Sequence, residues 1–231
     1  MSLTREDLEN DRFREHICRT NPNAGALSPE QIEASLQGTL AQRPADDQGD
    51  IWLFAYGSLI WNPLIHVEQH EVTRISGYHR RFCLWSTAGR GTPRQPGLVL
   101  ALDAGGCCQG VALRVRADHA VDELRLVWRR EMVVGSYCPR WVRVAVGGEQ
   151  RWAITFVVNR RHPGYAGRLH QDEVVEAMVR TRGHLGSPVE YLLRTVQGLE
   201  SHGVHDPHLV ALRERVLAVQ AGTADSPYMT A

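Results

Sequence analysis

Strand-like and helix-like segments follow one another in an order that restricts the fold more than any other feature of this chain. Between residues 51 and 158 the sequence consists mainly of short apolar runs separated by Gly and Pro, which is typical of β-strands. One helical pattern, at about 118–134, interrupts these runs, and the last third of the chain is helical. This order predicts an α+β fold whose sheet is mainly antiparallel, can curl into a barrel and is flanked by helices.

The expected elements have clear boundaries in the sequence. The strands are expected at 51–55, 71–75, 78–85, 98–103, 110–115, 141–146 and 152–158. One helix is expected at 171–182. A second is expected to follow the capping box that begins at Ser187, and a third to begin at Asp206.

Residues 1–48 differ from the chain that follows. Thr4 is placed to cap a short helix, and Ser28, Pro29 and Gln31 form the capping box of a second helix. Apolar residues recur every four positions along that second helix, so it is expected to dock by one face. We therefore predict an N-terminal helical extension and linker at 1–48 and a main domain at 49–231.

The charge balance bears on the class of ligand. Lys and Arg number 26, and Asp and Glu also number 26, so the chain has no net basic charge to hold nucleic acid. A small-molecule substrate is the expectation, while the oligomeric state stays open. No apolar run approaches the ~20 residues of a membrane span, and the N-terminus lacks the apolar core of a signal peptide.

Cysteine and histidine patterns argue against cofactor or metal chemistry. The five cysteines are odd in number and contain no Cys-x-x-Cys pair, which favours a reducing, cytoplasmic location. The adjacent Cys107 and Cys108 are interpreted as packing residues, with thiol redox activity as a minor alternative. The eleven histidines show no metal-binding spacing, so neither a metal nor a cofactor is predicted.

A loop of small residues follows the first expected strand. Ile51–Ala55 runs directly into Tyr56-Gly57-Ser58-Leu59. Glycine allows a ligand to approach the main chain, and the hydroxyl of Ser58 can donate and accept hydrogen bonds. Such a loop can turn its amide N–H groups outward as a cradle for an anion or an oxyanion. An ordinary junction between strand and turn remains the alternative interpretation.

The helical pattern at 118–134 places a carboxylate on its apolar face. Its apolar residues recur with a helical period at Val121, Leu124, Trp128 and Met132. At about 100° per residue, Glu131 lies about 20° from Leu124, whereas Arg129 and Arg130 fall outside the apolar arc. A glutamate on a buried face requires a polar partner or has a functional role.

The position of Glu131 along this helix suggests such a functional role. Gly135 is placed to end the helix, so Glu131 lies in the last turn, where the helix dipole and desolvation both raise the pKa of a carboxyl. A general base that works near neutral pH needs such a pKa. An ion pair with an arginine, such as Arg90 or Arg140, is the structural alternative, and the pattern alone leaves both interpretations open.

Several motifs together identify a family. In chain order they are Phe54-Ala55-Tyr56-Gly57-Ser58-Leu59-Ile60-Trp61-Asn62-Pro63, Gly77-Tyr78-His79-Arg80-Arg81-Phe82-Cys83-Leu84, Gly89-Arg90-Gly91-Thr92-Pro93, Arg130-Glu131-Met132, Asn159-Arg160-Arg161-His162-Pro163-Gly164-Tyr165 and Glu190-Tyr191-Leu192. With them, residues 51–217 resemble the ChaC-type, glutathione-specific γ-glutamylcyclotransferases. Ala55 departs from the family pattern, which often has Gly before the Tyr.

The resemblance implies an activity and a site within 49–231. In this family the α-amine of a γ-glutamyl unit attacks its own γ-amide carbonyl, so glutathione yields 5-oxoproline and Cys-Gly without a cofactor. By resemblance, Glu131 is the general acid/base and the loop at 56–59 binds the γ-glutamyl group, while Tyr165, Arg90 and Tyr137 line the pocket. The alternatives are a cyclotransferase for other γ-glutamyl amino acids or amines, and a non-catalytic γ-glutamyl- or protein-binding module of the same fold.

Overall fold

The computed structural model describes residues 3–224, in which one five-stranded sheet is flanked by seven helices. The strands are β1 Ile51–Ala55, β2 Gln69–Ser86, β3 Gly97–Val115, β4 Tyr137–Val146 and β5 Glu149–Val158. The helices are α1 Arg5–Glu9, α2 Arg12–Thr20, α3 Pro29–Ala41, α4 Ala120–Glu131, α5 Gln171–Arg180, α6 Pro188–Ser201 and α7 Pro207–Ala224.

The sheet is mixed and curled. Its strand order is β2-β3-β1-β5-β4, with antiparallel pairing throughout except where β5 runs parallel to β1 and, at one residue pair, to β3. The two edge strands approach each other, since the Ala145 amide donates to Thr73 Oγ1 at 3.1 Å and the Gly147 amide to Glu71 Oε1 at 2.6 Å. The predicted α+β class and the mainly antiparallel, barrel-like sheet are therefore confirmed.

Two pairs of expected strands are each one long strand. The chain passes through Gly77 within β2 and through Gly105 and Gly106 within β3, all three at positive φ. The β2–β3 register shifts at Gly77, so this glycine introduces a bulge and does not end the strand. The prediction of separate strands was wrong because glycine in a strand marks a bulge as readily as a turn.

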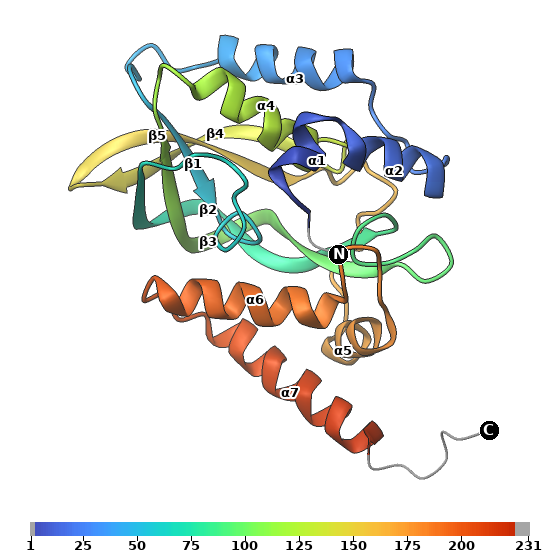
Figure 1. The fold of residues 1–231 in the computed structure, drawn as a ribbon. Helices are drawn as coiled ribbons and strands as arrows, with labels where there is room; N and C mark the ends of the chain where they lie inside the picture. Colours follow the sequence, from blue (N-terminus) through green and yellow to red (C-terminus); the bar gives the residue numbers. More distant parts are fainter. Residues whose placement is uncertain (1–2, 225–231) are drawn as a thin grey trace.

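Helices cover the sheet in two groups. Figure 1 shows α3 and α4 on one side of the sheet and α5, α6 and α7 on the other, with α1 and α2 beside α4. Trp128 of α4 is fully buried, and its ring meets that of Phe156 on β5 edge to face, with centroids 5.0 Å apart. This packing fixes α4, and therefore its C-terminal end, against the central strands.

The helix starts agree with the sequence signals. Ser28 and Gln31 exchange hydrogen bonds as a capping box at α3, and Ser187 does the same with Glu190 at α6. Thr4 caps α1 as predicted. At α4, however, the ordered helix ends at Glu131, three residues before the predicted end, so Glu131 is its last residue.

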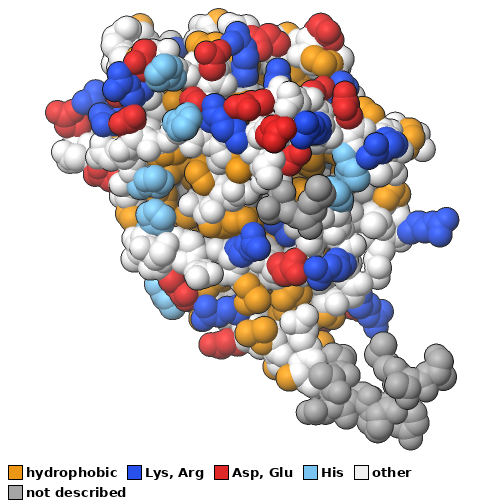
Figure 2. Space-filling view, in the orientation of Figure 1, with side chains coloured by type: hydrophobic (Ala, Val, Ile, Leu, Met, Phe, Trp, Pro, Cys, Tyr) orange, Lys and Arg blue, Asp and Glu red, His pale blue; other side chains and the backbone are white. Residues whose placement is uncertain are grey.

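Acidic and basic side chains are interspersed on the face shown in Figure 2 and are not gathered by sign. Within residues 3–224, no helix is both long and apolar enough to cross a membrane. The same residues contain no group of three or more His, Cys, Asp or Glu side chains that could hold a metal ion.

Candidate active site

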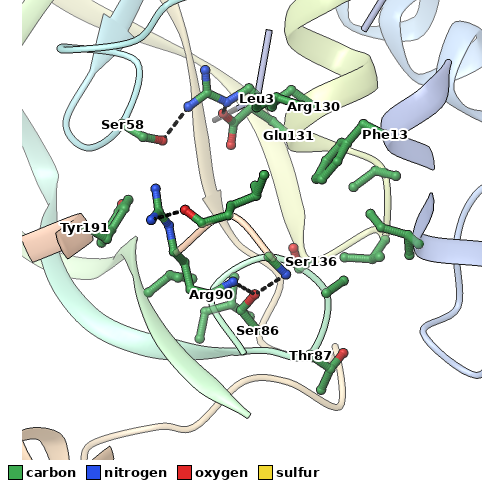
Figure 3. Close-up of a pocket in the computed structure, with 18 of the residues that line it drawn as sticks. Leu3, Phe13, Ser58, Ser86, Thr87, Arg90, Arg130, Glu131, Ser136 and Tyr191 are labelled. Carbon is green, nitrogen blue, oxygen red and sulfur yellow. Dashed lines mark hydrogen bonds and ion pairs between the residues drawn. The ribbon is translucent and has the colours of Figure 1, made fainter. Parts of the chain in front are cut away.

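Glu131 presents its carboxylate to a cavity from the end of α4 (Figure 3). Its side chain is 13% exposed, and Oε1 lies 3.0 Å from Nε of Arg130. Among the described residues Arg130 is the one cationic partner of Glu131. The alternative of an ion pair with an arginine is therefore confirmed, although the examples Arg90 and Arg140 were wrong. The partner is the preceding residue because α4 stops at Glu131 and both side chains turn toward the loop after β1.

Burial controls the ionisation of Glu131. Removal of the carboxylate from water raises its pKa, and the positive charge of Arg130 offsets part of this rise. The sequence predicted the direction of this shift and desolvation as a cause. A carboxyl with a raised pKa, open to a cavity, has the properties of a general base that returns its proton readily.

Arg130 joins the carboxylate to the loop after β1. Its Nη2 donates to Ser58 Oγ at 2.6 Å, and its Nη1 donates to the carbonyl of Asn62. The guanidinium side chain is only 10% exposed. The position of Arg130 outside the apolar arc of the helix did not indicate this burial. The side chain is covered by the loop at 58–62, which is not part of the helix.

The loop at 56–59 has free backbone donors. The amides of Ile60 and Asn62 donate back to the carbonyls of Gly57 and Ser58. In contrast, we find no acceptor for the Gly57, Ser58 and Leu59 amides anywhere in residues 3–224. Amides without a partner beside a half-buried hydroxyl suit an anion or a developing oxyanion, as the sequence suggested.

Gly57 is required by the close approach of a tyrosine. A Cβ at this position would lie 2.8 Å from the hydroxyl oxygen of Tyr191, the fourth residue of α6. The Tyr191 ring is itself held edge to face by Trp61 and Phe82. The small residue therefore allows α6 to bring a phenol directly to the loop.

Three phenols lie around the carboxylate: Tyr56 and Tyr191 are buried, and Tyr137 is half-buried. The hydroxyl of Tyr56 donates to the Phe156 carbonyl at 2.8 Å, and that of Tyr137 donates to the Leu100 carbonyl at 3.1 Å. Burial raises the pKa of Tyr56 and Tyr137 well above the usual value, and that of Tyr191 to about 12. All three stay protonated at neutral pH and can orient a substrate without adding negative charge.

The cavity is of a size that suits a small molecule. It has a volume of about 400 Å³ and includes Ser58, Arg90, Glu131, Tyr137 and Tyr191 in its lining. A second pocket of about 20 Å³ adjoins these residues and is bounded by the whole 56–59 loop, Leu100, Glu131, Tyr137, Phe156 and Tyr191. The structure thus brings together Glu131, the loop, Arg90 and Tyr137.

Arg90 forms no ion pair within 4.0 Å in the described part of the chain, although the nearby Glu190 carboxylate interacts with its charge. Its Nη1 donates to the Leu185 carbonyl, and its guanidinium carbon lies 5.5 Å from the ring centroid of Tyr191 and 6.0 Å from that of Trp61. Burial lowers its pKa, but an arginine remains charged at neutral pH. A positive charge of this kind in a cavity wall favours a ligand that carries a carboxylate.

Tyr165 lies apart from this group. Its hydroxyl donates to Asp103 Oδ2 at 2.8 Å, and Asp103 also pairs with Arg81 and Arg160. The backbone of Tyr165 bridges to Leu84 at the end of β2, and its ring packs against the small apolar cluster that contains Cys83. Tyr165 is not among the residues that line the cavity, so its predicted role at the pocket gains no support from the structure.

Comparison with known proteins decides the family. The model of the family described as "ChaC-like protein" matches residues 51–219, which is most of the chain. The chain belongs to the ChaC-like family. This membership confirms the resemblance inferred from the motifs.

Curated relatives of this ChaC-like chain carry one activity in their names. It is 41% identical over 183 residues to the glutathione-specific γ-glutamylcyclotransferase of Escherichia coli, with 79% of this chain and 78% of that protein covered. It is 33% identical over 186 residues to glutathione-specific γ-glutamylcyclotransferase 1 of Homo sapiens, with 76% and 83% covered.

Solved structures show the same fold. A crystal structure of a yeast γ-glutamyl cyclotransferase specific to glutathione superposes with a TM-score of 0.67 at 23% identity. The superposition covers 74% of this ChaC-like chain and 97% of the yeast chain. Residues 1–50 lie outside the range that the family model matches.

Sequence reasoning missed two groups of residues that shape the site. Arg130 and Tyr191 occur within the motifs, but Arg130 was placed only outside the apolar arc of its helix and Tyr191 was given no role at the site. Four residues of the N-terminal segment, Leu3, Phe13, Ile17 and Ala24, also line the cavity. Phe13 and Ile17 are four residues apart, which is a weak helical signal, but nothing in the sequence showed which surface they would cover.

Proposed function

We propose that this protein is a glutathione-specific γ-glutamylcyclotransferase that cleaves glutathione to 5-oxoproline and Cys-Gly. The observation that carries the proposal is the joint position of Glu131 and the 56–59 loop in one cavity, linked through Arg130. The names of the E. coli and human relatives support the choice of substrate. We assign the catalytic unit to 49–231, with 1–48 as its extension.

The proposed reaction needs no nucleophile from the protein. Glu131 takes a proton from the α-ammonium of the substrate, and the freed amine attacks the γ-carbonyl carbon. A C–N bond forms to close the five-membered ring, and the C–N bond to the cysteinyl nitrogen then breaks. That nitrogen receives the proton from Glu131, and the ring nitrogen then loses its second proton, by way of Glu131, to the released amine. The 5-oxoproline and Cys-Gly formed together contain all the atoms of glutathione.

The site supplies what this reaction requires. The free amides of the 56–59 loop are suited to stabilise the oxyanion that develops on the γ-carbonyl oxygen. Arg90 is suited to hold a substrate carboxylate, and the phenols of Tyr56, Tyr137 and Tyr191 confine the folded glutamyl chain. Holding the amine near the carbonyl can contribute several kcal/mol to catalysis.

The same geometry weighs against a purely binding role. A γ-glutamyl-binding module has no need for a carboxylate with a raised pKa beside the bound group, because burying an ionisable group reduces stability. We also place the protein in the cytoplasm, because glutathione and free cysteines coexist in a reducing compartment.

The direct test is turnover of glutathione by the purified chain. We expect equimolar 5-oxoproline and Cys-Gly by mass spectrometry, whereas protein heated beyond its unfolding transition should give neither. Parallel reactions with γ-Glu-Ala separate a glutathione enzyme from a general γ-glutamyl cyclotransferase by their kcat/KM values. Absence of both products from active, folded protein would contradict the proposal.

Gly57→Ala tests the role of the loop. The added methyl group would lie 2.8 Å from the Tyr191 hydroxyl, so we expect the loop and the phenol to separate and kcat/KM for glutathione to fall roughly tenfold. In Gly57→Ala/Tyr191→Phe the nearest ring atom, Cζ, is 3.9 Å away, so this pair should lose less than the sum of its single changes. Additive losses in steady-state kinetics would show that the contact does not position the loop.

A further inference from the structure

The N-terminal segment supplies one wall of the cavity. We define the N-terminal wall as Leu3, Phe13, Ile17 and Ala24, which line the same cavity as Ser58 and Glu131. Figure 3 shows Phe13 on the side of the cavity opposite Ser58 and Tyr191. All four residues lie outside the 51–219 range that the family model matches. The cavity of this chain is therefore completed by a segment that the family core does not provide.

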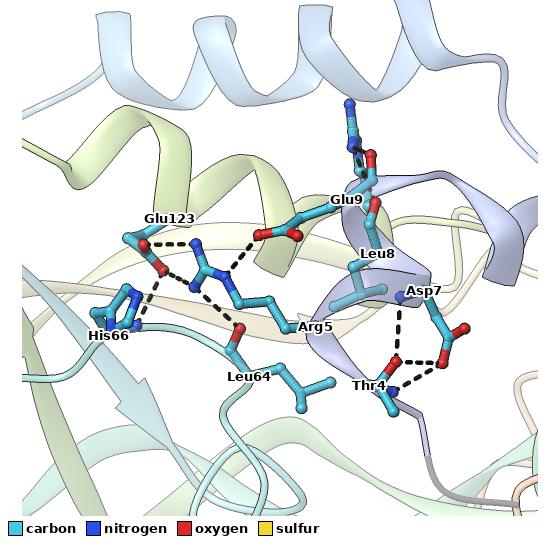
Figure 4. A network of polar contacts seen from close by, with 9 residues as sticks. Thr4, Arg5, Asp7, Leu8, Glu9, Leu64, His66 and Glu123 are labelled. Carbon is cyan, nitrogen blue, oxygen red and sulfur yellow. Dashed lines mark hydrogen bonds and ion pairs between the residues drawn. The ribbon is translucent and has the colours of Figure 1, made fainter.

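Ion pairing fixes the start of this segment to α4 (Figure 4). Arg5 of α1 donates to both carboxylate oxygens of Glu123, at 2.7 and 2.9 Å. The Glu123 side chain is 5% exposed and also accepts from the His66 amide at 2.9 Å. A bidentate pair around a buried carboxylate gives α1 a defined position on α4, which ends at Glu131.

Hydrogen bonds fix the rest of the segment on both sides of the cavity. Arg129 of α4 donates from Nη1 to the carbonyls of Leu8 and Glu9, at 2.9 and 2.8 Å. The side-chain amide of Asn21 donates to Thr87 Oγ1 at 2.9 Å, beyond the end of β2. The Leu27 amide donates to the Val133 carbonyl at 2.9 Å. These contacts fix the position of the N-terminal wall relative to the rest of the cavity.

The groups proposed to react and the N-terminal wall differ in chemistry. Charged and polar groups lie where the glutamyl end would react: Glu131, Arg130 and Ser58. The N-terminal wall has four apolar side chains, including the aromatic ring of Phe13. A substrate whose γ-glutamyl end occupies the polar side must direct its amine half away from it. An aromatic ring also makes favourable contacts with sulfur.

We propose that the N-terminal wall binds the cysteinyl half of the substrate and so determines which γ-glutamyl amides the enzyme accepts. This inference rests on the proposed function, since it assigns a subsite for the part of glutathione that leaves as Cys-Gly. Phe13 is the main specificity residue, because it is the largest side chain of the wall and is itself only partly buried.

Phe13→Ala gives the sharpest test. Loss of contact with the cysteinyl half, in substrate and transition state alike, should raise KM for glutathione roughly tenfold and change kcat less than about twofold. The vacated space should also raise the ratio of kcat/KM for S-methylglutathione to that for glutathione. Partial unfolding would lower both kcat/KM values by the same factor, so it cannot change this ratio.

Leu40→Ala is the matched control. Leu40 lies on α3 in the same N-terminal segment and packs against the core, but does not line the cavity. Its truncation should change the melting temperature without changing KM for glutathione or the ratio of the two kcat/KM values. Phe13→Leu replaces Phe13→Ala if the latter does not fold, and should raise the same substrate ratio by a smaller amount.

The outcomes separate this inference from the proposed function. If the wild-type chain releases no 5-oxoproline from glutathione, the proposed function fails. If the wild type turns over glutathione while both Phe13 variants keep its KM and its substrate ratio, the function stands and the N-terminal wall does not bind the cysteinyl half.

Discussion

Glu131→Gln is expected to slow glutathione turnover about 10²- to 10⁴-fold at neutral pH, the usual contribution of a general acid/base. Glutamine has nearly the same shape as glutamate but cannot take the proton of the substrate ammonium. Because the loss affects the chemical step, kcat should fall while KM for glutathione changes little. Steady-state kinetics that follow Cys-Gly release provide the measurement.

The fold should tolerate this change. Burial raises the pKa of Glu131, so its ionised form costs free energy in the folded state, and a neutral amide removes that cost. We expect a melting temperature within a few degrees of the wild type, measured by circular dichroism. Glu176→Gln, at an exposed carboxylate of α5, is the matched control and should keep full activity. Retention of more than about a tenth of the wild-type kcat in Glu131→Gln would place the base elsewhere.

Arg130→Met is expected to produce the second large effect, through positioning and charge. The change removes the hydrogen bond to Ser58 and the ion pair with Glu131, so the loop and the base lose their common support. We expect kcat/KM for glutathione to fall about 10²-fold at pH 7, as follows from a misplacement of about 1 Å at a reacting centre.

The pH dependence distinguishes this role from a general loss of structure. The base acts when ionised, so kcat/KM falls as the pH drops through the pKa of Glu131, which burial places above the usual value for glutamate. The charge of Arg130 lowers this pKa, and its removal should move the acidic limb to higher pH. Arg125→Met, on the exposed side of α4, should leave the limb in place. An unmoved limb in Arg130→Met would contradict the assigned pairing.

The two buried glutamates of α4 show what sequence pattern can and cannot resolve. Periodicity placed Glu131 on the apolar face and suggested its raised pKa. It did not reveal Glu123, whose burial comes from α1 and the loop at 64–66. Although burial acts to raise the pKa of Glu123, Arg5 and the His66 amide hold it below the usual value. The pKa values of the two carboxyls are therefore shifted in opposite directions, and the lowered pKa of Glu123 depends on partners distant in sequence.

Local signals predicted local structure reliably. The capping boxes at Ser28 and Ser187 begin helices because both partners lie within four residues of each other. The strand boundary predicted at Gly77 was wrong, because pairing with the neighbouring strand determines whether a glycine bends a strand or ends it. The N-terminal wall could not be predicted for the same reason, since its position depends on Glu123, Thr87 and Val133.

The contacts of Ser58 argue against a covalent acyl-enzyme intermediate at this residue. Its hydroxyl oxygen accepts from the guanidinium of Arg130, and in residues 3–224 we find no imidazole bonded to it that would remove its proton. A hydroxyl without a base to remove its proton is a poor nucleophile, so reagents that acylate activated serines are not expected to react at this position. In the proposed reaction every bond made or broken belongs to the substrate, and each cycle ends with product departure and no deacylation step.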